Sequence, residues 1–336
     1  MPPMNHPAPA LHPAELDSEL LARACKAIGD PLRLGILRLL GQGSFAVLEL
    51  CDLFDTKQSS MSHHLKILAQ AGLVVTQREG NSIYYRRPLL SQRDGWQRWL
   101  SSTLVAIDQS VDADSERQQA LQSRLQRLLD ERAEACAGFF ARNADVFRKQ
   151  QDLIASWDQY GETLEAMLVA WHGPALAALE IGPGEGAFLP SLAKRFGTVV
   201  ALDISSPMLE RAAALVSEHQ LHNVQCQLGD TNALLAQGAE RFDLAVANMV
   251  LHHVPAPRTI FSEVAALLSP GGCFLVTDLC RHQQTWARES CGDLWLGFAP
   301  EDLTAWAREA GLREGQSQFL GLRNGFQIQF RLFHRP

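Results

Sequence analysis

Three acidic residues in the second half of the chain stand where side chains could bind a ligand. Glu180 precedes the glycine-rich segment 182–186 (GPGEG), Asp203 ends the apolar run TVVALD, and Asp230 ends VQCQLGD. Closely spaced glycines let a backbone approach a bound molecule, and carboxylates accept hydrogen bonds from hydroxyl and amino groups. The pattern predicts a nucleoside site in which Glu180 faces an ammonium group, Asp203 a ribose and Asp230 an adenine amino group.

The glycine spacing indicates which nucleoside would bind. Gly-x-Gly-x-Gly, rather than Gly-x-Gly-x-x-Gly with a closely packed third glycine, favours S-adenosylmethionine over a dinucleotide. A purely structural role for these residues is the alternative, and three acids at successive strand ends argue against it. The predicted site also includes the following residues: Gly182, Gly184, Gly186, Ile204, Thr231 and Asn248.

A histidine pair follows the fourth apolar run of this region. His252 or His253 could act as a general base, although a pair in this loop could instead only pack against the cofactor. Methyl transfer from a sulfonium depends mainly on positioning, so no catalytic residue is obligatory. Asn248-Met249-Val250 differs from the Asn-Pro-Pro-aromatic run of amino-methylating DNA enzymes, and no Pro-Cys nucleophile suggests cytosine methylation. The acceptor is therefore predicted to be a small molecule.

Alternating strands and helices must position these residues. The strands are predicted in PALAALEIG, TVVALDIS, VQCQLGD, FDLAVANMV and GGCFLVTDL, with a terminal hairpin from QSQFLGL and FQIQFRLF. This order predicts an α/β fold with a parallel, doubly wound sheet and a ligand at the carboxyl ends of the strands.

Five segments of residues 174–334 carry a family resemblance: LEIGPGEG, ALDIS, GD before Thr231, FDLAVANMVLHHV and LLSPGG. In these segments the region resembles class I S-adenosylmethionine-dependent methyltransferases, above all the branch acting on ubiquinone and menaquinone precursors. The resemblance implies a Rossmann-like, seven-stranded domain. It also implies that Glu180 and Gly182 to Gly186 hold the methionine part, Asp203 the ribose, and Asp230 with Thr231 the adenine.

The first third of the chain has a different pattern. In KQSSMSHHLKILAQAGL, Met61, Leu65 and Leu68 recur at helical spacing and predict a buried stripe. The opposite face would present small polar side chains and one lysine, which suits a helix that enters a DNA major groove, although such a face could merely be solvated. The candidate DNA-binding residues of this helix are Gln58, Ser59, Ser60, Ser62, His63 and Lys66.

Two β-rich runs, LVVTQR and SIYYRR, flank the turn EGN and predict a basic hairpin, or wing. Arg78, Tyr84 and Arg86 of this hairpin are further DNA-binding candidates. The whole chain has a net charge of −7, but between Lys57 and Arg87 the only acidic residue is Glu79. A winged helix-turn-helix with one basic face is therefore expected.

Three segments of residues 19 to 90 carry a second family resemblance: IGDPLRLGILRLL, QSSMSHHLKILAQAGLV and REGNSIYYR. In these segments the region resembles the ArsR/SmtB family of bacterial winged-helix repressors. The resemblance implies a homodimer that represses a promoter with a two-fold, double-stranded DNA operator. Many metal-sensing members carry Cys-x-Cys just before an acidic residue; here Ala46 and Leu48 occupy those places before Glu49. Neither can ligate a metal, and Cys51 is better explained by packing, so no metal site is predicted.

Length and composition fit two packed domains: 336 residues, 46% of them apolar. The expected division is a disordered tail (1–18), a winged helix (19–95), a helical connector for dimerisation and pocket capping (96–170) and a methyltransferase domain (171–336). In the connector, Phe139, Phe140 and Phe147 either face the pocket or pack in the core.

The seven scattered cysteines and the lack of a signal peptide or an apolar run of about 20 residues predict a cytoplasmic protein without a membrane span.

Two functions that do not exclude each other are predicted, with ligand sensing placed first and turnover as the alternative. In the first, the chain is a transcription regulator whose pocket senses S-adenosylmethionine or S-adenosylhomocysteine, and the missing cysteine pair favours this because the repressor half then needs another effector. In the second, it is a working small-molecule methyltransferase with an autoregulatory DNA-binding domain. A predicted lid containing Trp286, Trp295 and Phe298 favours the second, because a sensor needs no acceptor pocket.

Overall fold

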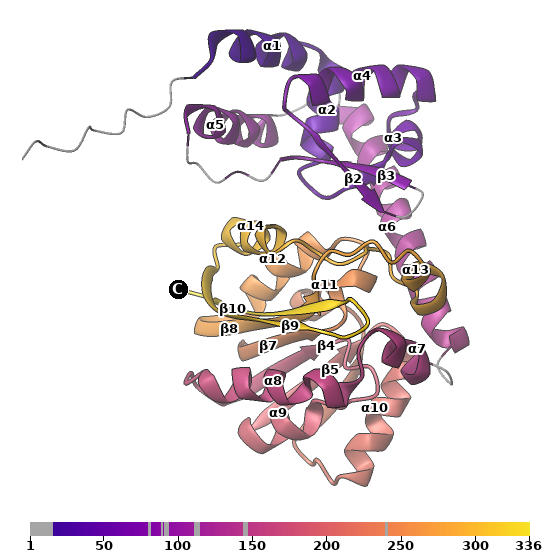
Figure 1. The fold of residues 1–336 in the computed structure, drawn as a ribbon, viewed down its shortest axis with the longest axis vertical. Helices are drawn as coiled ribbons and strands as arrows, with labels where there is room; N and C mark the ends of the chain where they lie inside the picture. The colour runs from indigo at the N-terminus through magenta and orange to yellow at the C-terminus, as the bar shows by residue number, and fades with distance from the viewer. Residues whose placement is uncertain are drawn as a thin grey trace, which may run out of the picture. The chain divides into compact units, whose positions relative to one another are not determined.

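The computed structural model describes residues 16–79, 82–88, 90, 94–110, 115–143, 147–238 and 241–336 (Figure 1). Most of the expected tail, and the side chains of Arg78 and Phe147, lie outside this description. The chain forms two compact units, and the boundary between Leu121 and Gln122 falls inside helix α6 (Ser115–Asn143). The expected connector is thus shared between the two units.

The first unit contains five helices and a small sheet among its described residues. The helices are α1 (Ser18–Ile28), α2 (Pro31–Leu39), α3 (Val47–Phe54), α4 (Gln58–Gln70) and α5 (Gly95–Gln109). Strands β1 (Phe45–Ala46), β2 (Val75–Glu79) and β3 (Ser82–Arg86) form a sheet in the order β1-β3-β2. Asp30 caps α2 by accepting a 3.0 Å hydrogen bond from the Arg33 amide, and Pro31 fills the first turn. The unit is a winged helix-turn-helix.

The second unit is built around a seven-stranded sheet. Its strands are β4 (Ala177–Ile181), β5 (Thr198–Asp203), β6 (Val224–Leu228), β7 (Phe242–Asn248), β8 (Leu268–Leu279), β9 (Arg313–Gly321) and β10 (Gln327–His334). They lie in the order β6-β5-β4-β7-β8-β10-β9; the first five are parallel, and β10 pairs antiparallel with β8 and β9. The predicted doubly wound sheet and terminal hairpin are confirmed.

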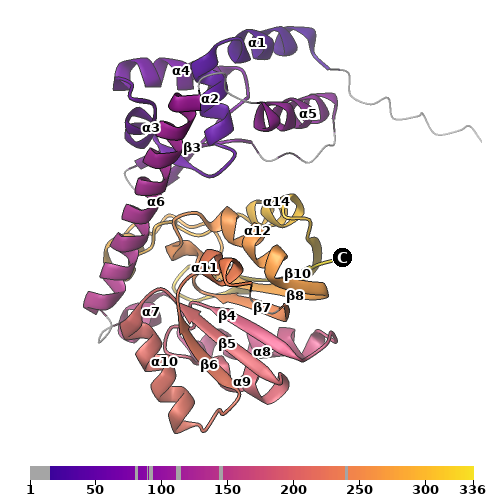
Figure 2. The ribbon, with the colours of Figure 1, turned by 180° about the vertical axis from the view of Figure 1, so that it is seen from behind.

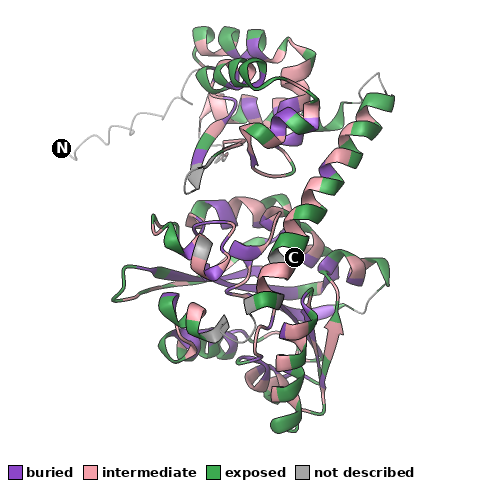
Figure 3. Cartoon of the chain, turned by 90° about the vertical axis from the view of Figure 1, so that its right-hand side faces the viewer, coloured by how far each residue is buried: buried purple, intermediate pink, exposed green. Residues whose placement is uncertain are grey.

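Helices cover both faces of this sheet (Figure 1). One face carries α8 (Trp157–Ala170), α9 (Leu189–Arg195) and α10 (Ser206–Glu218), and the other carries α11 (Thr231–Ala236), α12 (Pro257–Leu267) and α14 (Pro300–Glu309). The remaining helices of this unit are α7 (Phe147–Ile154), η1 (Leu251–His253) and α13 (Trp286–Cys291). Buried residues concentrate in the sheet and on the helix faces that contact it (Figure 3). Strand β4 is buried along its whole length, which is usual for a central parallel strand.

The strand order reverses next to β4. The chain runs from β4 to β5 to β6 in one direction and then returns to place β7 on the other side of β4 (Figure 2). At such a switch point the connections leave a crevice at the carboxyl ends of the strands. None of the described helices has the length and apolar character required to cross a bilayer.

Candidate functional site

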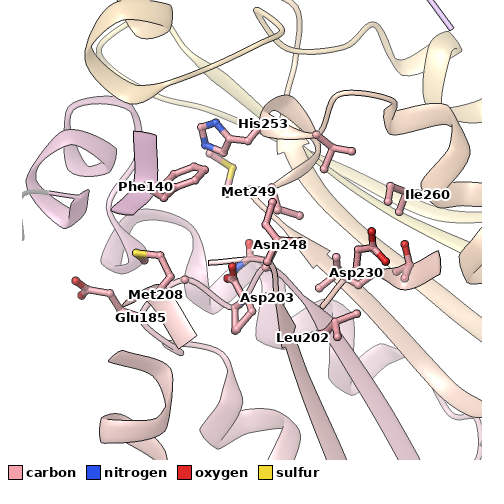
Figure 4. Close-up of a pocket in the computed structure, with 18 of the residues that line it drawn as sticks. Phe140, Glu185, Leu202, Asp203, Met208, Asp230, Asn248, Met249, His253 and Ile260 are labelled. Carbon is pink, nitrogen blue, oxygen red and sulfur yellow. The ribbon is translucent and has the colours of Figure 1, made fainter. Parts of the chain in front are cut away.

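A cavity of about 970 Å³ lies at this switch point in the second unit (Figure 4). The segments that follow β4, β5, β6 and β7 all contribute to its wall, so one site draws on four strand ends. The predicted residues that line it are Gly182, Gly184, Asp203, Ile204, Asp230, Thr231, Asn248 and His253. Glu180, Gly186 and His252 are not among its lining residues.

The turn after β4 depends on its glycines. Gly182 has φ +62° and Gly184 has φ +58°, a region that disfavours residues with a Cβ. A Cβ built on Gly182 would also lie 2.4 Å from Val250 Cγ2. The backbone of this turn therefore follows the cavity wall in a conformation and at a spacing that only glycine permits.

Asp203 ends β5 with its carboxylate at the cavity. Its Oδ1 accepts a 2.8 Å hydrogen bond from the Ser205 amide, which fixes the side-chain rotamer. Burial raises the pKa of Asp203 to about 6, and hydrogen bonds from backbone amides oppose that rise. This carboxylate is ionised at neutral pH and can accept hydrogen bonds from a bound hydroxyl group.

Asp230 has two roles available. It caps α11, where its Oδ1 accepts a 2.7 Å hydrogen bond from the Ala233 amide, and it also lines the cavity. Its neighbour Thr231 is buried and donates its hydroxyl to Oε2 of Glu263 in α12. Glu263 also lines the cavity, and burial raises its pKa. The sequence pattern did not reveal Glu263, because it lies inside a helix and not at a strand end.

Glu180 was predicted to face an ammonium group of the ligand, but it is buried and does not line the cavity. Only 1% of it is exposed, and its Oε2 has no hydrogen-bond partner among the described residues. Burial raises the pKa of Glu180 to about 8, so its carboxyl is mostly protonated at neutral pH. β4 is an interior strand of a covered sheet, and its side chains are therefore enclosed on both faces.

The far end of the cavity is aromatic. Phe140, Met249 and His253 lie at one end, whereas Asp230 and Ile260 lie at the other (Figure 4). Trp157 and Tyr160 of α8 also contribute to the wall. Of the three connector phenylalanines, Phe140 is the one shown to face the pocket. The predicted lid residues do not line the cavity: Trp295 and Phe298 are buried elsewhere, and Trp286 is 36% exposed.

The two histidines have different surroundings. His252 Nδ1 lies 2.7 Å from Asp278 Oδ1; burial alone lowers the pKa of His252, but Asp278 and Asp293 raise it to about 9. His253 Nδ1 lies 3.2 Å from the Gly292 carbonyl, and burial and the charge on His252 hold the pKa of His253 well below its ordinary value. His253 is therefore the neutral imidazole at the cavity wall, and its ring packs edge-on against Phe140.

Asp293 joins this pair from a distant part of the sequence. Donor atoms of His252, His253 and Asp293 all lie within 4.8 Å of one another. The sequence predicted no metal ligands, because forty residues separate Asp293 from His253 and no short motif links them.

In the first unit, α4 presents the predicted polar face. Met61, Leu65 and Leu68 are fully buried, which confirms the apolar stripe. The candidate DNA-contacting side chains of α4 are all exposed: Gln58, Ser59, Ser60, Ser62, His63 and Lys66.

Arg87, one of the basic residues counted for the wing, forms hydrogen bonds within the first unit. Arg87 forms two hydrogen bonds, of 2.8 and 2.5 Å, with the carboxylate of Asp108 in α5 and donates to the Leu37 carbonyl. The arginine therefore joins the wing to the unit's own helices. Tyr84 and Arg86 are partly exposed on β3.

Family comparisons agree with both architectures. Residues 179–276 match the family model described as a methyltransferase domain. The second unit has a methyltransferase fold. Residues 28–77 match the model described as a helix-turn-helix domain, which lies within the first unit.

Curated relatives match the methyltransferase domain. Ubiquinone biosynthesis O-methyltransferase from Coxiella burnetii (strain RSA 331 / Henzerling II) is 30% identical over 149 residues, which are 40% of this chain and 62% of that protein. The protein of the same name from Xanthomonas axonopodis pv. citri (strain 306) is 30% identical over 148 residues, with the same shares. The chain thus spans 62% of the length of these relatives.

Solved structures with similarity to this chain include the [4+2]-cyclase SpnF, with a TM-score of 0.49 and 16% identity over 60% of this chain and 94% of that chain. Another is N-methyltransferase NodS from Bradyrhizobium japonicum WM9 in complex with S-adenosyl-L-homocysteine. Its TM-score is 0.44, with 19% identity over 56% of this chain and 98% of that chain.

Proposed function

We propose that the second unit binds S-adenosylmethionine and transfers its methyl group to a hydroxyl group of a small molecule. One observation carries this proposal: a glycine turn and the carboxylates of Asp203 and Asp230 line a single cavity, which continues to an aromatic end. Supplying an activated methyl group is the chemistry of the cofactor, and the protein contributes binding and orientation.

The residues present fit the proposed cofactor. Asp203 would accept the ribose hydroxyls, and Asp230 with Thr231 would hold the adenine. The methionine part would lie along the glycine turn, because Gly182 and Gly184 line the cavity. Only glycine fits at position 182, since a Cβ there would overlap Val250. Glu180 precedes that turn, and its buried Oε2 has no hydrogen-bond partner among the described residues; a nearby ammonium group would favour the ionised form of this carboxyl.

The acceptor is assigned to the aromatic end. The cavity volume of about 970 Å³ lies near the top of the range of roughly 300–1,000 Å³ for small-molecule pockets, which favours two ligands over one. Phe140, Trp157 and Tyr160 would pack against a flat apolar acceptor. Two curated relatives are named O-methyltransferases, which supports a hydroxyl acceptor. The proton that leaves this hydroxyl would pass to the histidine end of the cavity, where His253 forms part of the wall.

The first unit favours a second, compatible function: ligand-dependent DNA binding by a homodimer. The exposed polar face of α4 suits contact with a DNA groove. Positions 46 and 48 hold Ala and Leu, so this helix-turn-helix needs a signal other than a metal at that place. S-adenosylmethionine or S-adenosylhomocysteine would regulate DNA affinity only by binding one conformation of the dimer better than another.

Calorimetry on the full chain tests the enzyme proposal first. S-adenosylmethionine and S-adenosylhomocysteine should each bind at one site per chain, and Asp203→Asn should weaken both. Transfer of a labelled methyl group to a panel of phenols, alcohols and amines then tests turnover. Binding without transfer to any class would leave sensing as the function, whereas no binding of either nucleoside would refute both proposals.

The regulatory proposal needs a DNA assay at fixed salt concentration. Sites selected from random duplexes by the full chain would be titrated with the protein alone and with each nucleoside present. A change in affinity with either nucleoside supports coupling. Equal affinity in all three conditions would show that the two units act independently.

A further inference from the structure

We propose that His252, His253 and Asp293 form a binding site for a divalent transition-metal ion. The three side chains come from two loops, η1 and the segment 292–295, and each is at least 97% buried. One donor atom from each residue lies within 4.8 Å of the other two. The site stands independently of the proposed function, since it is argued only from these three side chains and their surroundings.

The spacing of the donor atoms fits an ion better than a direct hydrogen bond. Asp293 Oδ1 lies 3.9 Å from His252 Nε2 and 3.8 Å from His253 Nδ1. Both distances are too long for a direct hydrogen bond. Ligands of a tetrahedral zinc ion lie about 3.3 Å apart. A shift of about half an ångström would close the site, with the His253 proton moved from Nδ1 to Nε2 and the 3.2 Å contact of Nδ1 with the Gly292 carbonyl given up.

The carboxylate of Asp293 is buried without a hydrogen bond in the described part of the chain, and Arg288 acts on it only through its charge. Only 2% of the residue is exposed, and neither of its oxygens has a hydrogen-bond partner among the described residues. A buried carboxylate without hydrogen bonds is costly, and a bound cation is one way to offset that cost. The amides of Leu294 and Trp295 both donate to the His252 carbonyl, at 2.9 and 3.1 Å, which holds Asp293 beside the histidine pair.

A second carboxylate orients one of the ligands. Asp278 Oδ1 lies 2.7 Å from His252 Nδ1, so Nε2 is the nitrogen that faces Asp293. This carboxylate–histidine arrangement supports metal-bound imidazoles in many proteins and raises their basicity. Asp278 is itself fixed, because the amides of Leu251 and Leu279 donate to its two oxygens.

The ligand set indicates the type of ion. Two imidazoles and one carboxylate suit zinc or another first-row transition metal, whereas magnesium and calcium prefer all-oxygen sites. Three protein ligands leave a coordination position for water or a substrate oxygen. His253 also lines the cavity, so an ion here would adjoin its aromatic end and could acidify an acceptor hydroxyl.

Metal titration of the chelator-treated full chain tests this site. Zinc binding would be measured by competition with a chromophoric chelator, and cobalt would serve as the spectroscopic probe. We expect one tight ion per chain, with affinity reduced about 100-fold or more in Asp293→Asn and His252→Gln and about 10- to 100-fold in Asp278→Asn. His219→Asn is the matched control, because His219 lines the same cavity but is exposed.

The wild-type protein provides a second readout in case the variants do not fold. X-ray absorption of the zinc-loaded chain should show about two imidazole ligands and no sulfur. Absence of a stoichiometric ion, a sulfur-rich ligand set, or equal affinity in a folded Asp293→Asn variant and the wild type would each overturn the proposal. Methyl transfer is not needed for any of these measurements, so their outcome is separate from that of the proposed function.

Discussion

The carboxylate of Asp278 and the imidazole of His252 form a buried pair, with 2.7 Å between Oδ1 and Nδ1 and side-chain exposures of 0% and 1%. Asp278 lies in β8 and His252 in η1, so the pair joins the sheet to the loop that follows β7. Burial works against charge on His252, but the neighbouring carboxylates raise its pKa to about 9, which keeps the imidazole of His252 protonated at neutral pH.

Breaking this pair should be costly. In chelator-treated protein, Asp278→Asn is expected to lower the free energy of unfolding of the second unit by about 3 kcal/mol or more, because the buried imidazolium of His252 loses the nearer of its two carboxylates. Urea denaturation measures the change. The double variant with His252→Gln should lose less than the sum of the two single variants. Glu309→Gln removes the surface pair with Arg258 and should cost about 1 kcal/mol or less; a cost as small for Asp278→Asn would contradict the prediction.

Glu180 should make stability depend on pH. Its folded pKa of about 8 lies above the ordinary value of 4.5, so the folded protein binds an extra proton between these values. Stability should therefore fall as pH rises from about 4.5 to 8 and then level off, by up to roughly 5 kcal/mol from this group. Comparing urea denaturation of the wild type and Glu180→Gln across this range isolates the effect.

The matched control for Glu180 is Glu162→Gln, which changes an exposed glutamate on α8. Its stability difference from the wild type should stay constant with pH. If the difference between the wild type and Glu180→Gln is equally constant, the carboxyl of Glu180 is not protonated in the folded protein.

Asp203 should give cofactor binding its own pH dependence. In the empty protein its pKa is about 6, and the ionised carboxylate is the form that accepts ribose hydroxyls best. Affinity for S-adenosylmethionine should thus be constant above pH 7. Below pH 6 it should fall with decreasing pH, and the slope should approach a tenfold loss per pH unit. Calorimetry at several pH values checks this.

Asp203→Asn should weaken binding about 10- to 100-fold at pH 8, the loss expected for a hydrogen bond to a charged group, and should flatten the pH profile. Glu210→Gln, an exposed residue of α10 outside the cavity lining, should bind like the wild type. A profile that keeps its shape in Asp203→Asn would assign the titration to another group.

Gly182→Ala should disrupt the cofactor turn for two reasons. The positive φ of +62° costs an alanine about 1 kcal/mol, and its Cβ would lie 2.4 Å from Val250 Cγ2. Affinity for S-adenosylmethionine should fall at least about tenfold as the turn shifts. Adding Val250→Ala should restore part of the loss.

Gly311→Ala separates strain from overlap, because Gly311 has φ +79° with nothing within 4 Å of an added Cβ. This variant should lose a little stability and keep its cofactor affinity. Normal affinity in Gly182→Ala would show that the turn does not follow the ligand.

Lys66 on α4 should contribute one phosphate contact to DNA binding. Lys66→Ala is expected to weaken binding to duplex DNA uniformly across sequences and to reduce the salt-dependence slope by about 1. Fluorescence anisotropy over a range of salt concentrations measures that slope. Lys194→Ala, an exposed lysine of α9 in the methyltransferase domain, should leave it unchanged; equal effects of the two variants would argue against α4 as the DNA-binding helix.

Periodic features of the sequence predicted most of the fold. The alternation of strands and helices gave the parallel sheet and its terminal hairpin, and Met61, Leu65 and Leu68 gave the buried face of α4. These predictions succeed because period and burial are local properties: residues three or four apart share a helix face, and a strand end marks the edge of a parallel sheet. Asp203 and Asp230 were found in this way.

Only the tertiary structure decided which residues meet. The wall contribution of Glu263, the burial of Glu180 and the pairing of Arg87 with Asp108 depend on neighbours from other elements. The same holds for Asp293, which reaches the histidine pair across forty residues of sequence. A sequence pattern carries no distance between such segments, because chain crossovers and side-chain packing set that distance, and with it the charge state of every buried group.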